Sequence, residues 1–532
     1  MKQIDLMTKF NRGLILALVE KNIFEAVQTY RQYIQYLKTG GYDEELKLTK
    51  EVFMKKLLDF VEDKKNEDKL DMLIPAYQEL INEYPDDYKF LFDCSKCFNK
   101  LKQEDIELEL LELAEKKAPS NLDIKKDILE ILKKKEKGFE MLKRAEFILE
   151  KEKLPNNYCL LSVANNLIYD VNNDFEYFKK AVSNMENAYN LDKSEKLFLK
   201  NLIVLYTKGK YDDKLKKAWE KYLEFQNNWN NEDYFDYGAY LIRNGNLKEG
   251  FKHYEKRFFH EKRPVKYPIK NKPFYKGEII KDKTLLVHYE QGLGDIFLFS
   301  RFLFNLKERA GKIILRMPKT VLEILKRSFP FCEVSDLKEK LPEFDYHLPL
   351  MSAPYVLGID KDSLGVKKGY LFSNKEKTEK FKKEIFNTDK FKIGISYKGN
   401  IVGLQTRNIP VEEFKALLDI DKVQLYSLQF EEKEVPSGII NLAPYIKDFD
   451  DTSSLIENMD LIVSIDNSVM NLAGAMGKKV FCLFNSLPEY RWFDLTGDDV
   501  KWYETVKPFI CDKQNNWAPV IEKVKFEIQG ML

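Results

Sequence analysis

The chain has 532 residues, with 87 Lys and Arg against 86 Asp and Glu, and 44% of its residues are hydrophobic. This composition is typical of a folded globular protein and excludes a fibrous or disordered chain. The length predicts several domains, because one hydrophobic core rarely grows beyond about 250–300 residues. A formal net charge of +1 provides no general attraction to nucleic acid or to an anionic membrane, so we expect neither as a partner.

Cysteine content and hydropathy predict a cytoplasmic protein. The six cysteines are sparse, which favours a reducing compartment over a disulfide framework. Cys94 and Cys97 form a CxxC, but no second Cys or His pair follows at metal-ligand spacing, so we interpret them as packed thiols. The apolar run 13–19 is too short to span a bilayer and precedes Glu20 and Lys21 instead of a cleavage site. We expect no export signal and no integral membrane segment.

The distribution of glycine and proline divides the chain near residue 270. Residues 1–270 contain 8 of the 23 Gly and 6 of the 18 Pro, and the remainder contains 15 and 12. The first part has successive helical patterns with short polar breaks, whereas the second alternates short β-branched or apolar runs with amphipathic stretches. We therefore predict an all-α domain over 1–270, followed by an α/β module.

The all-α part contains a repeat. Pro85, Pro119 and Pro155 close similar helical segments at separations of 34 and 36 residues, and each interval holds two helical patterns. One helix pair buries too little apolar surface alone, so neighbouring pairs must stack into a solenoid of roughly five to seven pairs. The pair at 231–258, with Gly238 at a close-packing position, resembles a tetratricopeptide (TPR) repeat. A TPR groove commonly binds a protein or peptide, and a passive spacer or a dimerisation surface is the alternative.

A strand, a glycine turn and a helix are predicted from residue 284, in "TLLVHYEQGLGDIFLFSRF". The turn lies at the carboxyl end of its strand, where open parallel sheets bind ligands. Gly292 and Gly294 permit a close backbone approach, and Asp295 lies at the helix start, where a carboxylate caps amides or faces a cleft. An N-capped turn without a functional role is the alternative interpretation of this segment alone.

The segment 459–484 repeats this arrangement nearer the C-terminus. "LIVSID" has the pattern of a buried strand, and Asp466, Asn467 and Ser468 supply N-cap chemistry for a helix of small residues. Free amides and the positive end of the helix dipole would then face the crevice, which predicts a diphosphate site.

Two cations belong to the loop after an earlier predicted strand, "FKIGISYKGN". Lys398 and Arg407 are placed to add positive charge to a phosphate group. As a lone residue, each would be an ordinary solvated charge.

The order of five segments carries a resemblance to a known family. "EQGLGDIFLFSRF", "SYKGN…TRNIP", "YSLQ", "DTSSLIENMDLIVSIDNSVMNLAGAMGKKV" and "EYRWF" together resemble the bacterial TPR-containing glycosyltransferases, whose catalytic part is related to heptosyltransferases and, more remotely, to O-GlcNAc transferases. The resemblance covers about 280–520 and implies a GT-B fold of two Rossmann-like subdomains. We place the acceptor-side subdomain at 280–375 and the nucleotide-sugar-binding subdomain, with its C-terminal helix, at 376–532.

The resemblance also implies roles for individual residues. Asp295 matches the glycine-turn aspartate of the heptosyltransferases and is the candidate general base, with Glu290 as the fallback. Asp466 would meet sugar hydroxyls, and Gln429 or Glu431 the ribose or base. The family usually dispenses with a catalytic metal, which fits a chain with four His and no His/Asp metal constellation, so we expect no metal and no other cofactor. The expected donor-binding residues are Gln291, Gly292, Gly294, Lys398, Asn400, Arg407, Gln429, Glu431, Asp466, Asn467, Ser468 and Asn471.

Two departures from the family pattern leave the identity of the donor open: Asn467 replaces a common Thr, and Asn471 replaces a common His. A third departure, Tyr397-Lys398 in place of an aromatic–small pair, still provides a phosphate-binding charge through Lys398. The string "EYRWF" at 489–493 either lines the cleft or packs between the subdomains.

We therefore predict a cytoplasmic, bacterial, inverting glycosyltransferase whose TPR domain recruits a protein acceptor. The donor is a nucleotide-sugar and the acceptor a hydroxyl, such as a Ser or Thr of flagellin or another surface protein by analogy with TPR-bearing bacterial transferases. A TPR scaffold with an inactive, nucleotide-binding GT-B module is the alternative. A sugar epimerase is a third interpretation, weakened because no dinucleotide GxGxxG with a distal acid is present. The nucleotide, the sugar, the acceptor and the oligomeric state stay open.

Overall fold

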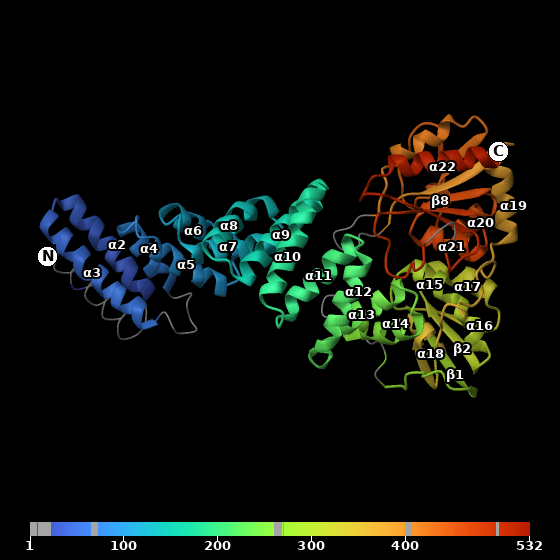
Figure 1. Cartoon of the computed structure of the whole chain (residues 1–532), viewed down its shortest axis with the longest axis horizontal. Coiled ribbons are helices and arrows are strands. Elements are labelled where there is room, and N and C mark those ends of the chain that lie inside the picture. The colour runs from blue at the N-terminus through green and yellow to red at the C-terminus, as the bar shows by residue number, and fades with distance from the viewer. Residues whose placement is uncertain are drawn as a thin grey trace. The chain divides into compact units, whose positions relative to one another are not determined.

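The structure is a computed structural model, and it describes residues 8, 23–64, 73–259, 269, 271–399, 407–495 and 500–532. The chain forms two compact units, Met1–Tyr222 and Leu223–Leu532. The first is built from helices, and the second contains two parallel β-sheets with their covering helices (Figure 1). The fold class is therefore the predicted one, an α-helical repeat region followed by an α/β module. Over the described ranges, no helix combines the length and the apolar content that crossing a bilayer requires.

Helices of the first unit pack against their neighbours in the chain. The first helices of three successive pairs, α5, α7 and α9, begin at Tyr88, Leu122 and Pro155, so their starts are 34 and 33 residues apart, close to the predicted period. Side chains fix such starts: Asn121 Oδ1 accepts hydrogen bonds from two amides in the first turn of α7. The helices are α2 (Ile23–Gly40), α3 (Asp43–Lys64), α4 (Ile74–Glu83), α5 (Tyr88–Lys100), α6 (Glu104–Lys117), α7 (Leu122–Lys134), α8 (Gly138–Lys151), α9 (Pro155–Asn172), α10 (Phe175–Leu191), α11 (Lys196–Lys208) and α12 (Asp212–Tyr222).

Apolar residues of the first unit gather in local clusters between neighbouring helices. Cys94 and Cys97 lie in one cluster as buried free thiols, which confirms their interpretation as packed thiols. Leu111, Ile128 and Ile148 are fully buried in the next cluster. Because each cluster joins only nearby helices, this unit has the local packing of a solenoid.

The first sheet of the second unit has four parallel strands in the order β3–β2–β1–β4. Leu285, Leu286 and Val287 of β1 are fully buried, because helices and loops cover both faces of a central parallel strand. The chain leaves β1 through α15 and returns to β2, as in a βαβ unit. The elements are β1 (Ile280–His288), α15 (Leu293–Phe299), α16 (Leu303–Lys307), β2 (Ala310–Met317), α17 (Leu322–Ser328), β3 (Cys332–Asp336), β4 (Tyr346–Pro349) and α18 (Ala353–Leu357).

The second sheet has six parallel strands in the order β10–β9–β8–β5–β6–β7. Alternate residues of β9 enter different cores: Phe481 and Leu483 pack with the C-terminal helix α22, and Cys482 packs with α21. This period of two is the geometry of a strand covered on both faces. The elements are α19 (Lys375–Glu384), β5 (Phe391–Ser396), β6 (Val423–Ser427), β7 (Ile439–Asn441), α20 (Phe449–Glu457), β8 (Leu461–Ile465), α21 (Ser468–Met476), β9 (Val480–Phe484), β10 (Val506–Ile510) and α22 (Ala518–Met531).

One hydrophobic core joins the two sheets. It includes Val287 of β1, Phe297 of α15, Leu472 of α21 and Trp502. Helices α15 and α21 lie against each other between the sheets (Figure 1). The two Rossmann-like subdomains therefore meet at the helices that follow β1 and β8, which is the predicted GT-B arrangement.

The helix pair α13 (Asn231–Arg243) and α14 (Leu247–Tyr254) belongs to the second unit. Phe251 lies in the same core as α15. The two helices approach closely at Gly238, where a Cβ would lie 2.9 Å from a carbonyl oxygen of α14. The change in composition predicted a boundary near residue 270, whereas the compact units divide after Tyr222, because this pair buries its apolar face in the core of the α/β unit.

Candidate functional site

Polar side chains collect at the carboxyl ends of the central strands of both sheets. β1 lies between β2 and β4, and β5 lies beside β8, so the strand order reverses at these places. Such switch points form ligand-binding crevices in open parallel sheets. Asp295 follows β1, Lys398 follows β5 and Asp466 follows β8, which places three predicted site residues at these positions.

Asp295 is held by the turn that follows β1. Gly292 has a φ of +60°, and a Cβ at this position would lie 2.2 Å from Asp295 Oδ2. Glycine is therefore required by the backbone and by the carboxylate together. Gln291 lies half-buried in the same turn. The Asp295 side chain is 10% exposed and forms an ion pair with Nη1 of Arg491, which comes from the other subdomain.

The start of α15 packs directly on the start of α21. A Cβ on Gly294 would lie 3.2 Å from Asn471 Nδ2 and 3.4 Å from the Cα atom of Ser468. Tyr503 donates a hydrogen bond of 2.9 Å to Asn471 Oδ1, and Asn471 Nδ2 donates to the carbonyl oxygen of Asn467 at 2.9 Å. Four residues predicted to bind the donor therefore lie against one another across the subdomain junction: Gly294, Asn467, Ser468 and Asn471.

Glu290 is part of a buried ion pair. Arg257 Nε and Nη2 donate to its two carboxylate oxygens at 2.6 and 2.7 Å. The side chain of Arg257 is 1% exposed and that of Glu290 is 2% exposed. Arg257 also donates to Glu255 and to Ser352 Oγ. Since both oxygens of Glu290 accept from one guanidinium, the geometry favours Asp295 over this fallback base.

Asp466 lies at the end of β8 between a cation and an indole. Arg407 Nη1 and Trp492 Nε1 both donate to Asp466 Oδ2, each at 2.8 Å. Burial raises the pKa of Asp466 above its ordinary value, and Arg407 and the indole N–H oppose that rise. Asp466 and Arg407, both predicted for the donor site, are therefore brought into direct contact.

Asn467 is the N-cap of α21. Its Oδ1 accepts hydrogen bonds from the amides of Val469 and Met470 at 3.0 and 3.1 Å. Its Nδ2 donates to Ser396 Oγ at 2.8 Å, which ties the helix start to β5. The prediction of free amides facing the crevice is wrong for Val469 and Met470, because the capping side chain occupies both.

Lys398 lies at the end of β5 beside another carboxylate. Its ammonium forms an ion pair with Glu432, and its amide donates to Gln429 Oε1 at 2.9 Å. Gln429 therefore holds the backbone after β5, and its contact with ribose or base stays a prediction. Glu431 is exposed in the adjacent turn, with a φ of +56°. Asn400 lies outside the described residues.

A pocket of about 170 Å³ opens at the ends of β8 and β9. Its charged lining comes from Asp466, Arg407, Glu489 and Arg243 of α13. The rest of the lining is mostly apolar and includes Leu483, Phe484 and Leu487, so the pocket combines charged groups with an apolar wall. Lys398 lines a separate open pocket beside β5 and β6.

The segment 488–492 makes contacts that the sequence did not assign. Arg491 pairs with Asp295, and Trp492 donates to Asp466, so neighbouring residues reach both candidate carboxylates. In the sequence, only the string "EYRWF" after a predicted strand indicated this segment. Two roles were predicted for it as alternatives: lining the cleft, or packing between the subdomains. Both alternatives apply to different residues of this string. Arg491 makes a contact between the subdomains, whereas Glu489 and Tyr490 line the pocket.

Two more arginines reach this region from the helical segment before the sheets. Arg243 donates to the carbonyl oxygen of Pro488 at 3.0 Å, and Arg257 holds Glu290. No sequence pattern marked them, because an arginine on a helix is ordinarily a solvated charge. Where the structure describes side chains, no group of three or more His, Cys, Asp or Glu is placed to bind a metal ion. Metal independence stays a prediction.

Comparison with known proteins gives similarity without a family assignment. No protein-family model matches the chain. The chain is 23% identical over 327 residues to protein FlbA of Caulobacter vibrioides, a match that covers 53% of this chain and 52% of FlbA. The match thus spans about half the length of this curated relative.

Three solved structures are similar to portions of the chain. The E. coli ADP-heptose LPS heptosyltransferase II has 14% identity and a TM-score of 0.36, with 47% of this chain and 98% of that chain covered. A glycosyl transferase family 9 protein from Veillonella parvula has 11% identity and a TM-score of 0.34, covering 47% and 91%. MamA from Desulfovibrio magneticus has 14% identity and a TM-score of 0.26, covering 38% and 97%. At these identities and TM-scores the similarity assigns no activity.

Proposed function

We propose that the second unit is an inverting, metal-independent glycosyltransferase that moves a sugar from a nucleotide-sugar donor to a protein hydroxyl. The helical repeats of the first unit bind the protein acceptor in this proposal. The observation that carries it is the pairing of two buried aspartates, Asp295 and Asp466, with Arg491 and Arg407 at the carboxyl ends of the two sheets. Sugar transfer needs a carboxylate base and cations beside the developing negative charge.

Each bond change in the proposed reaction has a candidate group. The acceptor oxygen forms a bond to the anomeric carbon while the bond from that carbon to the phosphate oxygen breaks. The carboxylate of Asp295 takes the proton of the acceptor hydroxyl, and the electron pair of the broken bond leaves with the diphosphate. The sugar gains oxocarbenium character in the transition state, and the departing phosphate gains negative charge. Attack opposite the leaving group inverts the anomeric carbon.

The proposed donor contacts follow from the positions of the charged groups. Arg407 and Lys398 flank the β5 and β8 strand ends and are the proposed partners of the diphosphate. The Lys398 side chain is 51% exposed, so an anionic ligand can compete with Glu432 for its ammonium. Asp466 lines the pocket and is proposed to accept hydrogen bonds from sugar hydroxyls.

A nucleotide-binding scaffold without catalysis is the second candidate. It is favoured by the close packing of Gly294 on the start of α21, which leaves little space for an acceptor beside Asp295. The two candidates differ in turnover, since a scaffold binds a nucleotide and transfers no sugar.

The first test is a thermal-shift screen of the full chain against UDP, GDP, CMP, ADP and dTDP, with representative sugar conjugates of each. A ligand that binds only the folded state stabilises it by RT ln(1 + L/Kd), where L is the ligand concentration, so at equal concentration the tighter ligand gives the larger rise in melting temperature. We expect one nucleotide to be preferred and its sugar conjugate to give the larger shift. A screen without any shift would contradict donor binding, and a shift without sugar transfer would favour the scaffold.

Asp295→Asn tests the transfer step. We expect sugar transfer from the donor found in the screen to fall by about 10²- to 10⁴-fold, because the variant has no base for the acceptor proton. Donor affinity should stay within about threefold, since the base acts on the acceptor. The matched control is Asp336→Asn at the carboxyl end of β3, which should keep both properties. Parallel loss of donor affinity and transfer in Asp295→Asn would indicate a structural role.

A further inference from the structure

The segment 488–492, which follows β9, is anchored on the helix pair α13–α14. Arg243 of α13 donates to the carbonyl oxygen of Pro488 at 3.0 Å. The ring of Tyr490 packs against the ring of Tyr254 of α14, with the ring centroids 5.8 Å apart. Because α13 and α14 share the core of the α/β unit, these contacts fix the backbone on the approach to Arg491.

Arg491 is fixed at its backbone and at its guanidinium. Trp502 Nε1 donates to the carbonyl oxygen of Arg491 at 2.8 Å. Glu489 accepts from Nε and from Nη2, the latter at 3.0 Å, so one edge of the guanidinium is held. The other terminal nitrogen, Nη1, pairs with Asp295. A planar guanidinium held along one edge presents its remaining donor in a fixed direction.

We propose that Arg491 is a positioning residue for Asp295: it holds the carboxylate at the start of α15 in the orientation that receives the acceptor proton. This inference rests on the proposed function, because Arg491 is assigned the role of orienting the carboxylate that acts as the proposed base. The Asp295 and Arg491 side chains are 10% and 16% exposed, so water screens their pair only partly. Without the guanidinium, a carboxylate this buried turns toward water, and this change removes the base from its position beside the acceptor.

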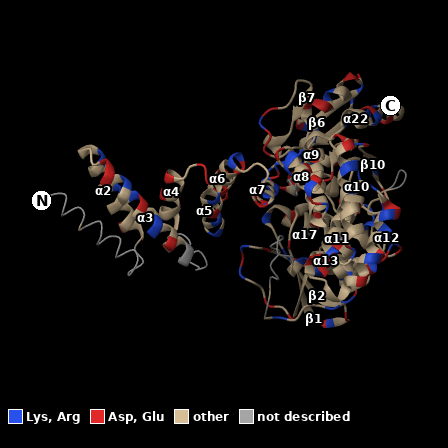
Figure 2. Cartoon of the chain, turned by 60° about the vertical axis from the view of Figure 1, so that its left-hand side comes forward, with Lys and Arg blue, Asp and Glu red and all other residues tan. Residues whose placement is uncertain are grey.

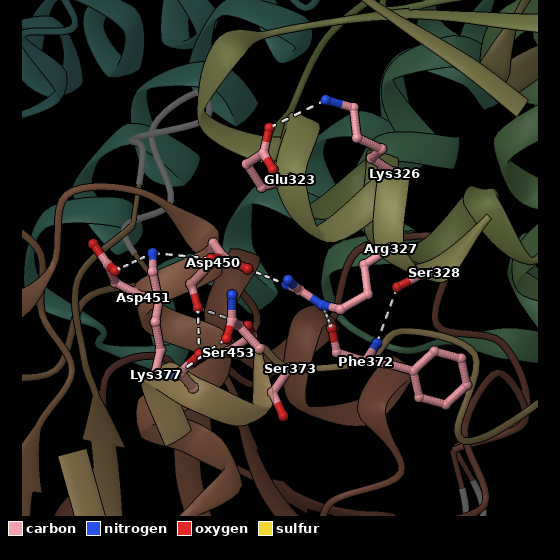
Figure 3. Close-up of polar contacts among 12 residues, drawn as sticks. Glu323, Lys326, Arg327, Ser328, Phe372, Ser373, Lys377, Asp450, Asp451 and Ser453 are labelled. Carbon is pink, nitrogen blue, oxygen red and sulfur yellow. Dashed lines mark hydrogen bonds and ion pairs between the residues drawn. The ribbon is translucent and has the colours of Figure 1, made fainter. Parts of the chain in front are cut away.

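A second Arg–Asp pair joins the same two subdomains at a different point (Figure 3). Arg327 of α17 pairs with Asp450 of α20 and donates to the carbonyl oxygen of Phe372 at 2.9 Å. Lys377 also pairs with Asp450, at 2.9 Å. The Asp450 side chain is 5% exposed, so this carboxylate is at least as buried as Asp295. Arg327 is therefore a matched control with the same residue types, the same subdomains and no predicted role in the site.

The test compares Arg491→Ala, Arg491→Lys and Arg327→Ala in the full chain. Transfer kinetics are measured with the nucleotide-sugar that the thermal-shift screen selects, and hydrogen exchange is measured for the amides of residues 293–299. We expect Arg491→Ala to lower kcat by about 100-fold or more while the donor KM changes by less than about threefold. Arg491→Lys should regain about tenfold of that loss, since it restores a cation without the planar fork. Arg327→Ala should keep kcat within about threefold.

Three kinetic results would overturn the proposal. An equal loss of kcat in Arg327→Ala would mean that either pair acts by joining the subdomains. A loss confined to the donor KM would make Arg491 a donor-binding residue. An unchanged kcat in Arg491→Ala would mean that Asp295 needs no guanidinium to act. If Arg491→Ala does not fold, the neutral variant Arg491→Gln replaces it under the same expectations.

The exchange measurement separates this proposal from the proposed function. If the wild-type chain transfers no sugar, the proposed function fails, and exchange alone decides the role of Arg491. Faster exchange over 293–299 in Arg491→Ala, with wild-type exchange there in Arg327→Ala, supports positioning of the α15 start. Identical exchange in all variants and in the wild type would overturn it.

Discussion

The helical unit and the α/β unit use charged residues differently. In the helical unit, acidic and basic residues are interspersed along the helices, and pairs such as Lys134–Glu104 have side chains 59% and 38% exposed (Figure 2). In the α/β unit, Arg257 and Arg301 are 1% and 0% exposed. Water and salt screen exposed pairs, which contribute little, whereas a buried guanidinium is costly to leave unpaired. The helical unit also holds less exposed pairs, such as Lys125–Glu115 with side chains 10% and 15% exposed, but among the described residues only the α/β unit buries guanidinium groups this fully.

Arg301 shows what such burial achieves. Its guanidinium and Nε donate to the carbonyl oxygens of Leu298 and Trp502 and to the hydroxyl of Tyr370. Leu298 belongs to the first subdomain and Trp502 to the second, so one side chain joins both. The α/β unit thus depends on a few long-range contacts, whereas the solenoid repeats a local one many times.

The largest stability effect is expected at Arg257. Arg257→Met keeps an unbranched side chain but leaves Glu290 and Glu255 without their guanidinium, and breaking a buried pair from one side costs about 3–5 kcal/mol. We expect the opening free energy of β1 and α14 to fall by this amount in native-state hydrogen exchange of the full chain. A loss below about 1 kcal/mol would remove the contrast between the two units.

A pH effect of intermediate size is expected from His288 in the first sheet. Burial lowers its pKa from 6.5 to about 4, and its ring stacks on that of His347, 5.4 Å away between centroids. The unfolded chain therefore binds more protons than the folded chain between these two values. The stability contributed by a neutral His288 is complete above pH 6.5 and is lost as the pH falls toward 4.

The measurement is the melting temperature of wild type and His288→Gln from pH 7 to pH 4. At about 1.4 kcal/mol per unit of pKa difference, the histidine accounts for up to roughly 3 kcal/mol of the acid-dependent loss. We expect the variant to lose less stability than the wild type over this range. Parallel curves would show that His288 does not titrate with unfolding.

The smallest effect is expected at Arg144 of α8. Its guanidinium donates to Glu115 Oε2 at 2.7 and 3.0 Å, and its side chain is 20% exposed. Arg144→Ala should lower the local opening free energy of α6 and α8 by less than about 1 kcal/mol, because Lys125 still pairs with Glu115 at 2.6 Å and keeps its carboxylate compensated. Hydrogen exchange measures this in the same way as for Arg257. A cost equal to that of Arg257→Met would mean that the solenoid also depends on individual ion pairs.

The sequence predicted the features that depend on near neighbours in the chain. The proline spacing anticipated the period of the helix pairs, and the strings "QGLGD" and "DNS" anticipated Asp295 and Asn467 at helix starts after buried strands. These features follow from side-chain periodicity, glycine conformation and capping, which act within one turn or one strand. The division into a helical repeat and an α/β module is readable for the same reason.

Only the tertiary structure decided which polar groups meet. The contacts of Arg243 with Pro488, Arg301 with Trp502 and Arg327 with Asp450 join residues 245, 201 and 123 positions apart. A single charged residue belongs to no repeating sequence pattern that would identify its partner. The sequence therefore left Asp295 and Glu290 as alternative candidates for the general base. Packing of the two sheets buried the side chains of Glu290 and Asp295. Because an unpaired buried charge is costly, each carboxylate is paired with an arginine that is distant in the sequence.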